Sequence, residues 1–145
     1  MLNIEEIEKF IPHRKPFLLL DEVEIVSKSK VIGYKYFDGN EFYLTGHFPE
    51  SPIVPGVILI ESAAQTSAIL TNMNKGSVSE NKEGVLVKIS NFTFKKIVRP
   101  NKKIRNDVEL IRNFKEIYIY KCKIYCDQDM IAYGEITATL STKEE

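Results

Sequence analysis

The feature that most constrains this chain is one long apolar segment, residues 56–74, with the sequence GVILIESAAQTSAILTNMN. After its first residue it contains no glycine or proline, and Glu61 is its one charged residue. The segment therefore predicts a helix that is apolar on all sides. Such a helix must be covered over most of its surface by the rest of the chain, by a second copy, or by both.

The rest of the chain has mostly strand patterns. Six segments alternate or carry β-branched and aromatic residues: 17–26, 30–37, 85–98, 103–112, 116–126 and 130–141. Short polar turns between consecutive strands favour an antiparallel sheet. We therefore expect one α+β domain over residues 1–145, with a sheet that curls around the long helix.

Two further segments complete the expected order of elements. Asn3 and Glu6 form the pattern of a capping box for a short helix over Ile4 and Phe10, which Pro12 ends. Residues 76–84 read as a polar connector without a regular pattern.

Composition excludes several classes of partner. Twenty basic residues balance twenty acidic ones, so the net charge is zero and predicts no overall attraction to nucleic acid or anionic membranes. No secretory signal or apolar run of bilayer length is visible, and we expect a cytoplasmic protein.

Cys122 and Cys126 lie four residues apart on one expected strand. This spacing separates them by about 13 Å, which is too far for a disulfide. The two histidines, His13 and His47, are distant in sequence, so we expect no metal site and no cofactor.

Glu61 is the unusual residue of the apolar helix. A buried carboxylate is costly and is usually paired or protonated. One interpretation is a structural glutamate paired with an arginine or lysine from a strand. The other is a carboxylic acid kept protonated so that it can donate a proton in catalysis.

His47 offers a counterpart to Glu61. It precedes a loop with three prolines, at positions 49, 52 and 55, which fix φ and reduce the conformational freedom of the loop. Gly56 follows at the helix N-terminus, where free N–H groups favour developing negative charge. A base, an acid and an oxyanion site are what proton abstraction beside a carbonyl with loss of a β-leaving group requires. A histidine in a loop can equally be structural.

These residues carry a resemblance. The stretches IPHRKPFLLLDEV (residues 11–23) and GHFPESPIVPGVILIESAAQ (residues 46–65) resemble the FabZ-type 3-hydroxyacyl-[acyl-carrier-protein] dehydratases, and FTFKKIVRP (residues 92–100) is similar to the strand that follows their helix. The resemblance implies a hot-dog fold, a dimer or a trimer of dimers, and a cofactor-free site. It places the catalytic histidine at His47, the catalytic carboxylate at Glu61 and the oxyanion glycine at Gly56, with Phe48 and Val57 beside the substrate. In the family the histidine comes from one subunit and the carboxylate from its partner.

The resemblance implies dehydration of (3R)-3-hydroxyacyl thioesters on acyl carrier protein to trans-2-enoyl thioesters. The alternatives are a hot-dog acyl-thioesterase, or an acyl-binding subunit of low activity that works with a related partner. Departures from the family pattern occur at Glu50, Ser51 and residues 100–102 and after Asp21. They leave a specialised lipid or polyketide pathway open beside fatty acid synthesis.

Two other features have both a structural and a functional interpretation. His13 either belongs to a turn that anchors the N-terminal helix or lies at the rim of the acyl channel. A basic cluster either is an ordinary solvated strand and turn or docks the acidic carrier protein; its members are Lys95, Lys96, Arg99, Lys102, Lys103 and Arg105.

Overall fold

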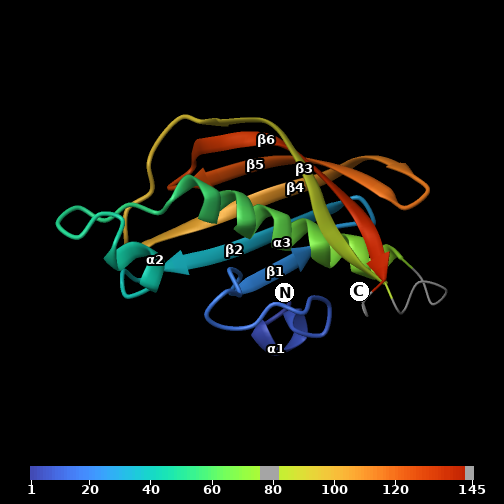
Figure 1. Ribbon diagram of the computed structural model, residues 1–145, viewed down its shortest axis with the longest axis horizontal. Helices are drawn as coiled ribbons and strands as arrows, with labels where there is room; N and C mark the ends of the chain where they lie inside the picture. Colours follow the sequence, from blue (N-terminus) through green and yellow to red (C-terminus); the bar gives the residue numbers. More distant parts are fainter. Residues whose placement is uncertain (76–81, 143–145) are drawn as a thin grey trace.

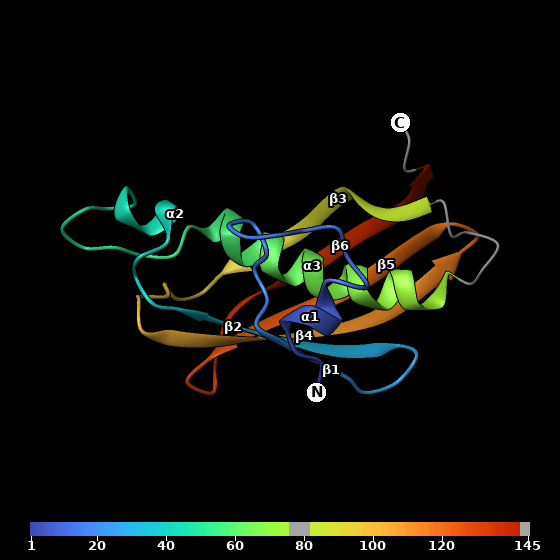
Figure 2. The same ribbon diagram turned by 90° about the horizontal axis from the view of Figure 1, so that it is seen from below.

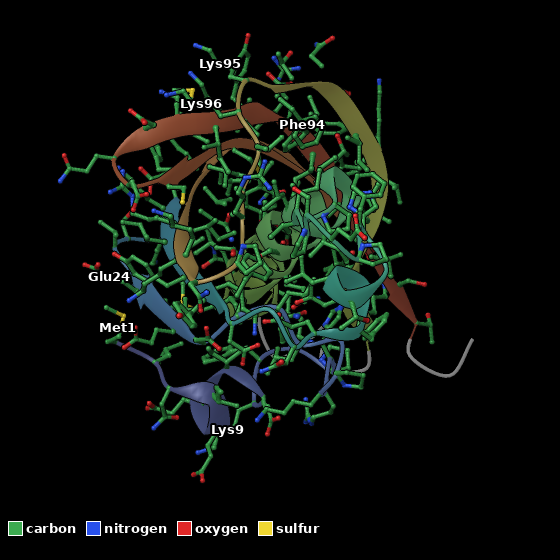
Figure 3. The ribbon with its side chains drawn as sticks, turned by 90° about the vertical axis from the view of Figure 1, so that its left-hand side faces the viewer. Met1, Lys9, Glu24, Phe94, Lys95 and Lys96 are labelled. Atoms are coloured by element: carbon green, nitrogen blue, oxygen red, sulfur yellow. The ribbon has the colours of Figure 1, made fainter. Side chains whose placement is uncertain are left out.

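The computed structural model describes residues 1–75 and 82–142. Its elements are α1 (Ile4–Ile7), β1 (Glu22–Ile25), β2 (Lys30–Phe37), α2 (Phe42–Thr45), α3 (Gly56–Asn74), β3 (Lys82–Phe94), β4 (Lys102–Phe114), β5 (Ile117–Cys126) and β6 (Asp129–Thr142). The strands form one six-stranded sheet in the order β1-β2-β4-β5-β6-β3, and every neighbouring pair is antiparallel. The sheet wraps around α3 (Figure 1; Figure 3 gives the end-on view). The expected α+β hot-dog fold is confirmed.

The bounds of α3 are those that the apolar segment predicts. The helix buries Leu59, Ala63 and Leu70 in the core, together with the polar residue Thr66. Gly33 on β2 allows the close approach of helix and sheet, because a Cβ atom there would overlap the hydroxyl oxygen of Thr66. Helix and sheet therefore pack at a distance that only glycine allows at this point.

The N-terminal capping box is present. The side chain of Asn3 accepts from the N–H of Glu6 at 2.9 Å, and the side chain of Glu6 accepts from the N–H of Asn3 at 3.1 Å. The helix itself is shorter than the pattern predicts, because α1 ends at Ile7 and the N–H groups that follow make tighter turns, such as that of Phe10 to the carbonyl of Ile7 at 2.9 Å.

The expected strand over residues 17–26 is largely wrong, since β1 covers only Glu22–Ile25. The three leucines before β1, Leu18 to Leu20, are buried, but the backbone of Leu19 bonds to side chains of α3 instead of to a strand. Leu19 donates its N–H to the side chain of Gln65 at 2.7 Å, and its carbonyl accepts from the hydroxyl of Ser62 at 2.7 Å. We call residues 12–20 the strap, because this segment crosses over α3 (Figure 2).

The edge strand β3 begins at Lys82, inside the connector expected over residues 76–84; residues 76–81 lie outside the described residues. Among the strands of residues 1–75 and 82–142, its one neighbour in the sheet is β6. Val85, Leu86, Val87 and Ile89 on this strand are between 37% and 55% exposed. An apolar edge of this kind is a template for pairing with another chain.

Cys122 and Cys126 both lie on β5 and are free thiols, as their spacing predicts. None of the helices in residues 1–75 and 82–142 is long and apolar enough to span a membrane.

Candidate active site

Glu61 lies in the second turn of α3 and is less enclosed than its apolar neighbours predict. Its side chain is 25% exposed. It lines a cavity of about 340 Å³ whose wall comes from the strap, α3, β3 and β6. The lining residues are Pro12, His13, Glu61, Ala64, Gln65, Ser67, Ala68, Gly84, Val85, Leu86 and Ala138. Glu61 therefore carries its carboxyl group into an otherwise apolar or neutral polar hollow, with His13 as the other ionisable group.

The same carboxyl oxygen of Glu61 has two neighbours. Gln65 donates from Nε2 to Oε2 at 3.0 Å, and His13 Nε2 lies 3.6 Å from Oε2. Among the described residues no lysine or arginine forms an ion pair with Glu61. The ionisable side chain that lies beside Glu61 is therefore His13 of the strap, and not the lysine or arginine of a strand that a structural ion pair would require.

Gln65 fixes both the strap and the carboxyl group. It is 1% exposed, and its amide also donates to the carbonyl of Phe17 at 2.9 Å and accepts from Leu19. Sequence reasoning missed this residue, although an amide four positions after Glu61 lies on the same helix face. His13, which the sequence placed at the channel rim or in an anchoring turn, lies on the cavity wall.

A second buried polar group supports this arrangement from the sheet. Asn106 on β4 is fully buried and donates to the hydroxyl groups of Ser62, at 2.9 Å, and Thr66, at 3.3 Å. Ser62 in turn donates to the carbonyl of Leu19. The strap, α3 and β4 are thus joined by one hydrogen-bonded network in the half of α3 that carries Glu61.

His47 lies in the loop between α2 and α3, and its ring has a defined tautomer. Nδ1 lies 3.2 Å from the carbonyl of Ile53. A carbonyl can only accept, so Nδ1 carries a proton, and in the neutral ring the lone pair is therefore on Nε2. The ring also stacks on Phe48, with centroids 4.4 Å apart, and Phe48 is 54% exposed. A neutral imidazole with a free Nε2 is suited to act as a base.

Hydrogen bonds hold the proline loop at both ends. Ile53 donates its N–H to the carbonyl of His47 at 2.8 Å, and Val54 donates to the carbonyl of Val98 at 2.8 Å. Arg99 donates to the hydroxyl of Ser51 at 2.9 Å. These contacts, with the prolines, fix the backbone that carries His47.

Gly56 begins α3, with Pro55 as its N-cap. The first N–H groups that bond back are those of Ile58 and Leu59, both to the carbonyl of Pro55. The N–H groups of Gly56 and Val57 come before these first hydrogen bonds of the helix. They can therefore donate to a negatively charged atom at the helix N-terminus. A Cβ atom at Gly56 would lie 2.9 Å from the ring of Phe94, and Val57 is 74% exposed at the start of the helix.

Within one chain no hydrogen bond, ion pair or ring contact among the described residues joins His47 to Glu61. Among the described residues, the contacts of His47 are with Ile53 and Phe48, and those of Glu61 are with Gln65 and His13. The loop with His47 precedes the N-terminus of α3, whereas Glu61 points into the cavity beside the strap and β3. The described part of one chain therefore gives His47 and Glu61 no direct contact with each other.

The basic cluster is largely neutralised. Four of its six members pair with carboxylates: Lys96 with Asp129 at 3.0 Å, Lys102 with Asp127 at 2.6 Å, Lys103 with Glu22 at 3.3 Å and Arg105 with Asp107 at 2.9 Å. The hydrogen bond that Lys102 donates to the Asp127 carboxylate raises the pKa of Lys102. Lys95 lies beside Lys96 at the top of the view in Figure 3, and Arg99 bonds to the proline loop. The positive charge of the cluster that no ion pair among the described residues neutralises is therefore at Lys95 and Arg99.

Solved structures similar to this one show the fold. The dehydratase heterocomplex ApeI:P from Xenorhabdus doucetiae is 17% identical, with a TM-score of 0.77 over 96% of this chain and 93% of that chain. A thioesterase from Haemophilus influenzae is 12% identical, with a TM-score of 0.70 over 100% of this chain and 94% of that chain. Both dehydratases and thioesterases thus share this architecture.

Sequence comparisons are more specific. The profile of the FabA-like domain family matches residues 11–135. A 3-hydroxyacyl-[acyl-carrier-protein] dehydratase FabZ from Clostridium perfringens is 40% identical over 136 residues, which are 94% of this chain and 96% of that protein. The FabZ of Bacillus cytotoxicus is 38% identical over 146 residues and covers 100% of both chains. The chain therefore belongs to the FabA-like family, as a member of the FabZ-type 3-hydroxyacyl-[acyl-carrier-protein] dehydratases.

Proposed function

We propose that this protein dehydrates (3R)-3-hydroxyacyl thioesters carried on acyl carrier protein, with His47 as base and Glu61 of a second chain as acid. Nε2 of His47 takes the proton from C2, and Glu61 gives a proton to the 3-hydroxyl group, which leaves as water. The N–H groups at Gly56 and Val57 stabilise the charge that develops on the thioester oxygen. The observation that carries this proposal is the contact of His47 Nδ1 with Ile53, which leaves Nε2 free as a base.

The chemistry is tested by incubation with a 3-hydroxyacyl thioester on carrier protein or pantetheine. Loss of one water with the thioester intact is the expected result. Release of free acid and thiol would mean a thioesterase, and recovery of unchanged substrate would mean an acyl-binding subunit of low activity.

The roles of the two residues are tested by substitution. We expect Glu61→Gln to lower turnover by roughly 10² to 10⁴, the usual contribution of a general acid, because the amide keeps the shape and loses the proton. His47→Ala should cause a similar loss, and the double variant should be little worse than either, since the residues act together. A Glu61→Gln protein with near-normal turnover per folded molecule would contradict the role of Glu61.

We further propose that the working unit is a homodimer or a trimer of such dimers, paired through the edge strand β3. Three observations support this. No other described strand pairs with the outer side of β3, the strand exposes the apolar residues Val85, Leu86, Val87 and Ile89, and two of these residues also line the cavity of Glu61. A second copy on this edge would cover the cavity and bring its own His47 loop. Light scattering at micromolar concentration should give a dimer or larger. Full activity in a monomer would refute the proposal, and activity only with a related subunit would replace the homodimer by a heterodimer.

We propose that the protein works in the cytoplasm, where its two free thiols would stay reduced.

We propose the carrier protein as the partner of the basic cluster. Because the other members are paired, Lys95 and Arg99 should contribute more than Lys96, Lys102 and Lys103. Lys95→Gln should raise KM for carrier-linked substrate and leave pantetheine-linked substrate unaffected. Lys102→Gln is the matched control. Rates with carrier-linked substrate should also fall more steeply with salt, and equal salt responses would make the cluster ordinary surface.

A further inference from the structure

The cavity that contains Glu61 extends along one face of α3. The helix contributes five residues to its wall, which are Glu61, Ala64, Gln65, Ser67 and Ala68, and no helix residue beyond Ala68 takes part although α3 is described to its end. Positions three, four and seven after Glu61 share its face of the helix, so the wall follows the helix axis. From Glu61 to Ala68 the axis advances by about 10 Å. The cavity therefore has Glu61 at one end of its helical wall and Ala68 at the other.

The wall between these two ends fits hydrocarbon. Its apolar residues come from the strap, α3, β3 and β6: Pro12, Ala64, Ala68, Val85, Leu86 and Ala138. The hydroxyl of Ser67 donates to the carbonyl of Ala64 at 2.7 Å, and the amide of Gln65 is bonded to the strap and to Glu61. Because these polar groups already have partners within the chain, a ligand needs no matching polar groups beside them. An alkyl chain has this property.

Asn72 lies on the same helix face, one turn after Ala68, and its side chain bonds to both sides of the cavity. Its Nδ2 donates to the carbonyl of Phe10 at 2.7 Å, in the segment that leads into the strap. Its Oδ1 accepts from the N–H of Gly84 on β3 at 3.4 Å. Gly84 lines the cavity, and so does Pro12, two residues after Phe10. The amide of Asn72 therefore joins the strap side to the β3 side at the point where the cavity ends.

A second hollow, of about 380 Å³, lies beyond this bridge. Asn72 and Phe10 belong to its lining, and Pro12 is the residue that it shares with the cavity of Glu61. Four charged residues also line it: Glu8, Lys9, Arg14 and Lys75. Asn72 and Pro12 thus form a partition between an apolar cavity that holds the catalytic carboxyl group and a polar hollow next to it.

We propose that Asn72 is the chain-length stop of the acyl cavity, so that the substrates of this protein are short and medium acyl chains. This rests on the proposed dehydratase function, which places the 3-hydroxyl group, and hence C3, at Glu61. The thioester end stays attached to the carrier outside the protein, so C4 and the carbons after it extend from Glu61 toward Ala68. An extended alkyl chain advances by about 1.3 Å per carbon, so about 10 Å of wall takes roughly seven carbons beyond C3, or about ten carbons in all.

The first test is the dependence of kcat/KM on chain length in wild type. The substrates are (3R)-3-hydroxyacyl chains of 4 to 16 carbons on one carrier protein. Each methylene that the wall buries should raise kcat/KM by up to about fourfold. We expect kcat/KM to rise to about ten carbons and to be lower by roughly tenfold or more at fourteen, because the last carbons have no apolar wall to cover them. An equal kcat/KM from ten to sixteen carbons would overturn the proposal.

The second test removes the stop. Asn72→Ala opens the cavity into the second hollow, so the ratio of kcat/KM at fourteen carbons to that at ten should rise at least tenfold over wild type. Asn74→Ala is the matched control at the same end of the helix. Asn74 also donates from Nδ2 to a backbone carbonyl, that of Lys28 at 2.8 Å, but it lines neither hollow. Its ratio should equal that of wild type.

The third test fills the cavity in front of the stop. Ala68→Leu should lower the ratio of kcat/KM at ten carbons to that at four by tenfold or more. A general loosening of the fold would not shift chain-length preference in opposite directions in Asn72→Ala and Ala68→Leu. If Asn72→Ala fails to fold, Asn72→Ser, which is smaller and can still form a hydrogen bond, takes its place beside Ala68→Leu.

A binding measurement separates the failure of this proposal from the failure of the proposed function. Saturated acyl chains on the same carrier protein lack the 3-hydroxyl group and cannot be dehydrated, so calorimetry with them reports binding alone. Binding should be weaker by roughly tenfold at fourteen carbons than at ten in wild type, and this difference should disappear in Asn72→Ala. A wild-type length preference in Asn72→Ala, in binding and in kcat/KM, would overturn the stop. Absence of dehydration at every chain length, with the length preference of binding as expected, would overturn only the proposed function.

Discussion

Replacing Gln65 by leucine should loosen the strap. The change removes three hydrogen bonds: from the N–H of Leu19 at 2.7 Å, to the carbonyl of Phe17 at 2.9 Å and to Glu61 at 3.0 Å. Leu19 is fully buried, so its N–H has no access to water and costs about 1–3 kcal/mol when left unpaired. Phe17 is partly exposed, and losing its bond costs about 0.5–1.5 kcal/mol.

Together these terms predict a loss of about 2–4 kcal/mol in the free energy of unfolding. For a domain of this size each kcal/mol lowers Tm by about 2–4 °C, so Tm should fall by roughly 4–16 °C. The assay is thermal unfolding at one fixed protein concentration, because any oligomer makes Tm concentration-dependent. Turnover per folded molecule should fall as well, since Glu61 and the strap lose their common anchor.

Ser67→Ala is the matched control on the same helix. Ser67 is also buried, but its hydroxyl donates to the carbonyl of Ala64 in its own helix, at 2.7 Å. Its removal leaves no strap group unpaired and should cost no more than about 1 kcal/mol. If Gln65→Leu melts within about 3 °C of Ser67→Ala, the strap does not depend on these bonds and the reasoning is wrong.

Other predictions concern packing and thiol chemistry. Gly33→Ala should lower the free energy of unfolding in urea by about 1–3 kcal/mol, because the new Cβ atom would overlap Thr66. Adding Thr66→Ala in the same chain should restore part of that free energy. An unchanged urea midpoint in Gly33→Ala would contradict the close approach of helix and sheet. Burial raises the pKa of Cys122 to about 12, and Cys126 is more exposed, so an aromatic disulfide reagent at pH 8 should label Cys126 first; equal rates would contradict this. Below about pH 8.5, the pKa of the thiol in the unfolded chain, the neutral Cys122 thiol makes its full contribution to the stability of the fold. This contribution is lost as pH rises through the higher pKa that the thiol has in the folded state. Cys122→Ala should therefore flatten the fall of Tm between pH 9 and pH 11, and an equally steep fall would argue against it.

Local signals in the sequence predict several elements well. The uninterrupted apolar segment gives the bounds of α3, the pattern at Asn3 and Glu6 gives the capping box, and residues 30–37 give β2. Each of these depends on residues within one helix turn or one strand. The family motif gives the positions of His47 and Glu61, and the structure shows where each residue lies.

The features that the sequence did not predict depend on contacts between distant segments. Residues 17–19 have a strand pattern, but the partners of their backbone are side chains on α3, more than 40 residues later. The place of His13 beside Glu61 follows from the same contacts. Likewise, the carboxylate that neutralises Lys102 comes from the turn between β5 and β6, and the one that neutralises Lys96 comes from the first residue of β6. No local pattern contains this information, because the pairing is decided by the tertiary path of the chain.

The separation of His47 from Glu61 within one chain has a genetic consequence. Under the proposed dimer, each polypeptide contributes the basic half of one site and the acidic half of the other. A chain defective in the first half and a chain defective in the second, when coexpressed, form a mixed dimer in which one site has both normal residues and the other has neither. Two inactive alleles should therefore complement each other. Gene duplication followed by loss of one half in each copy would yield an obligate pair of unlike subunits without any change of fold.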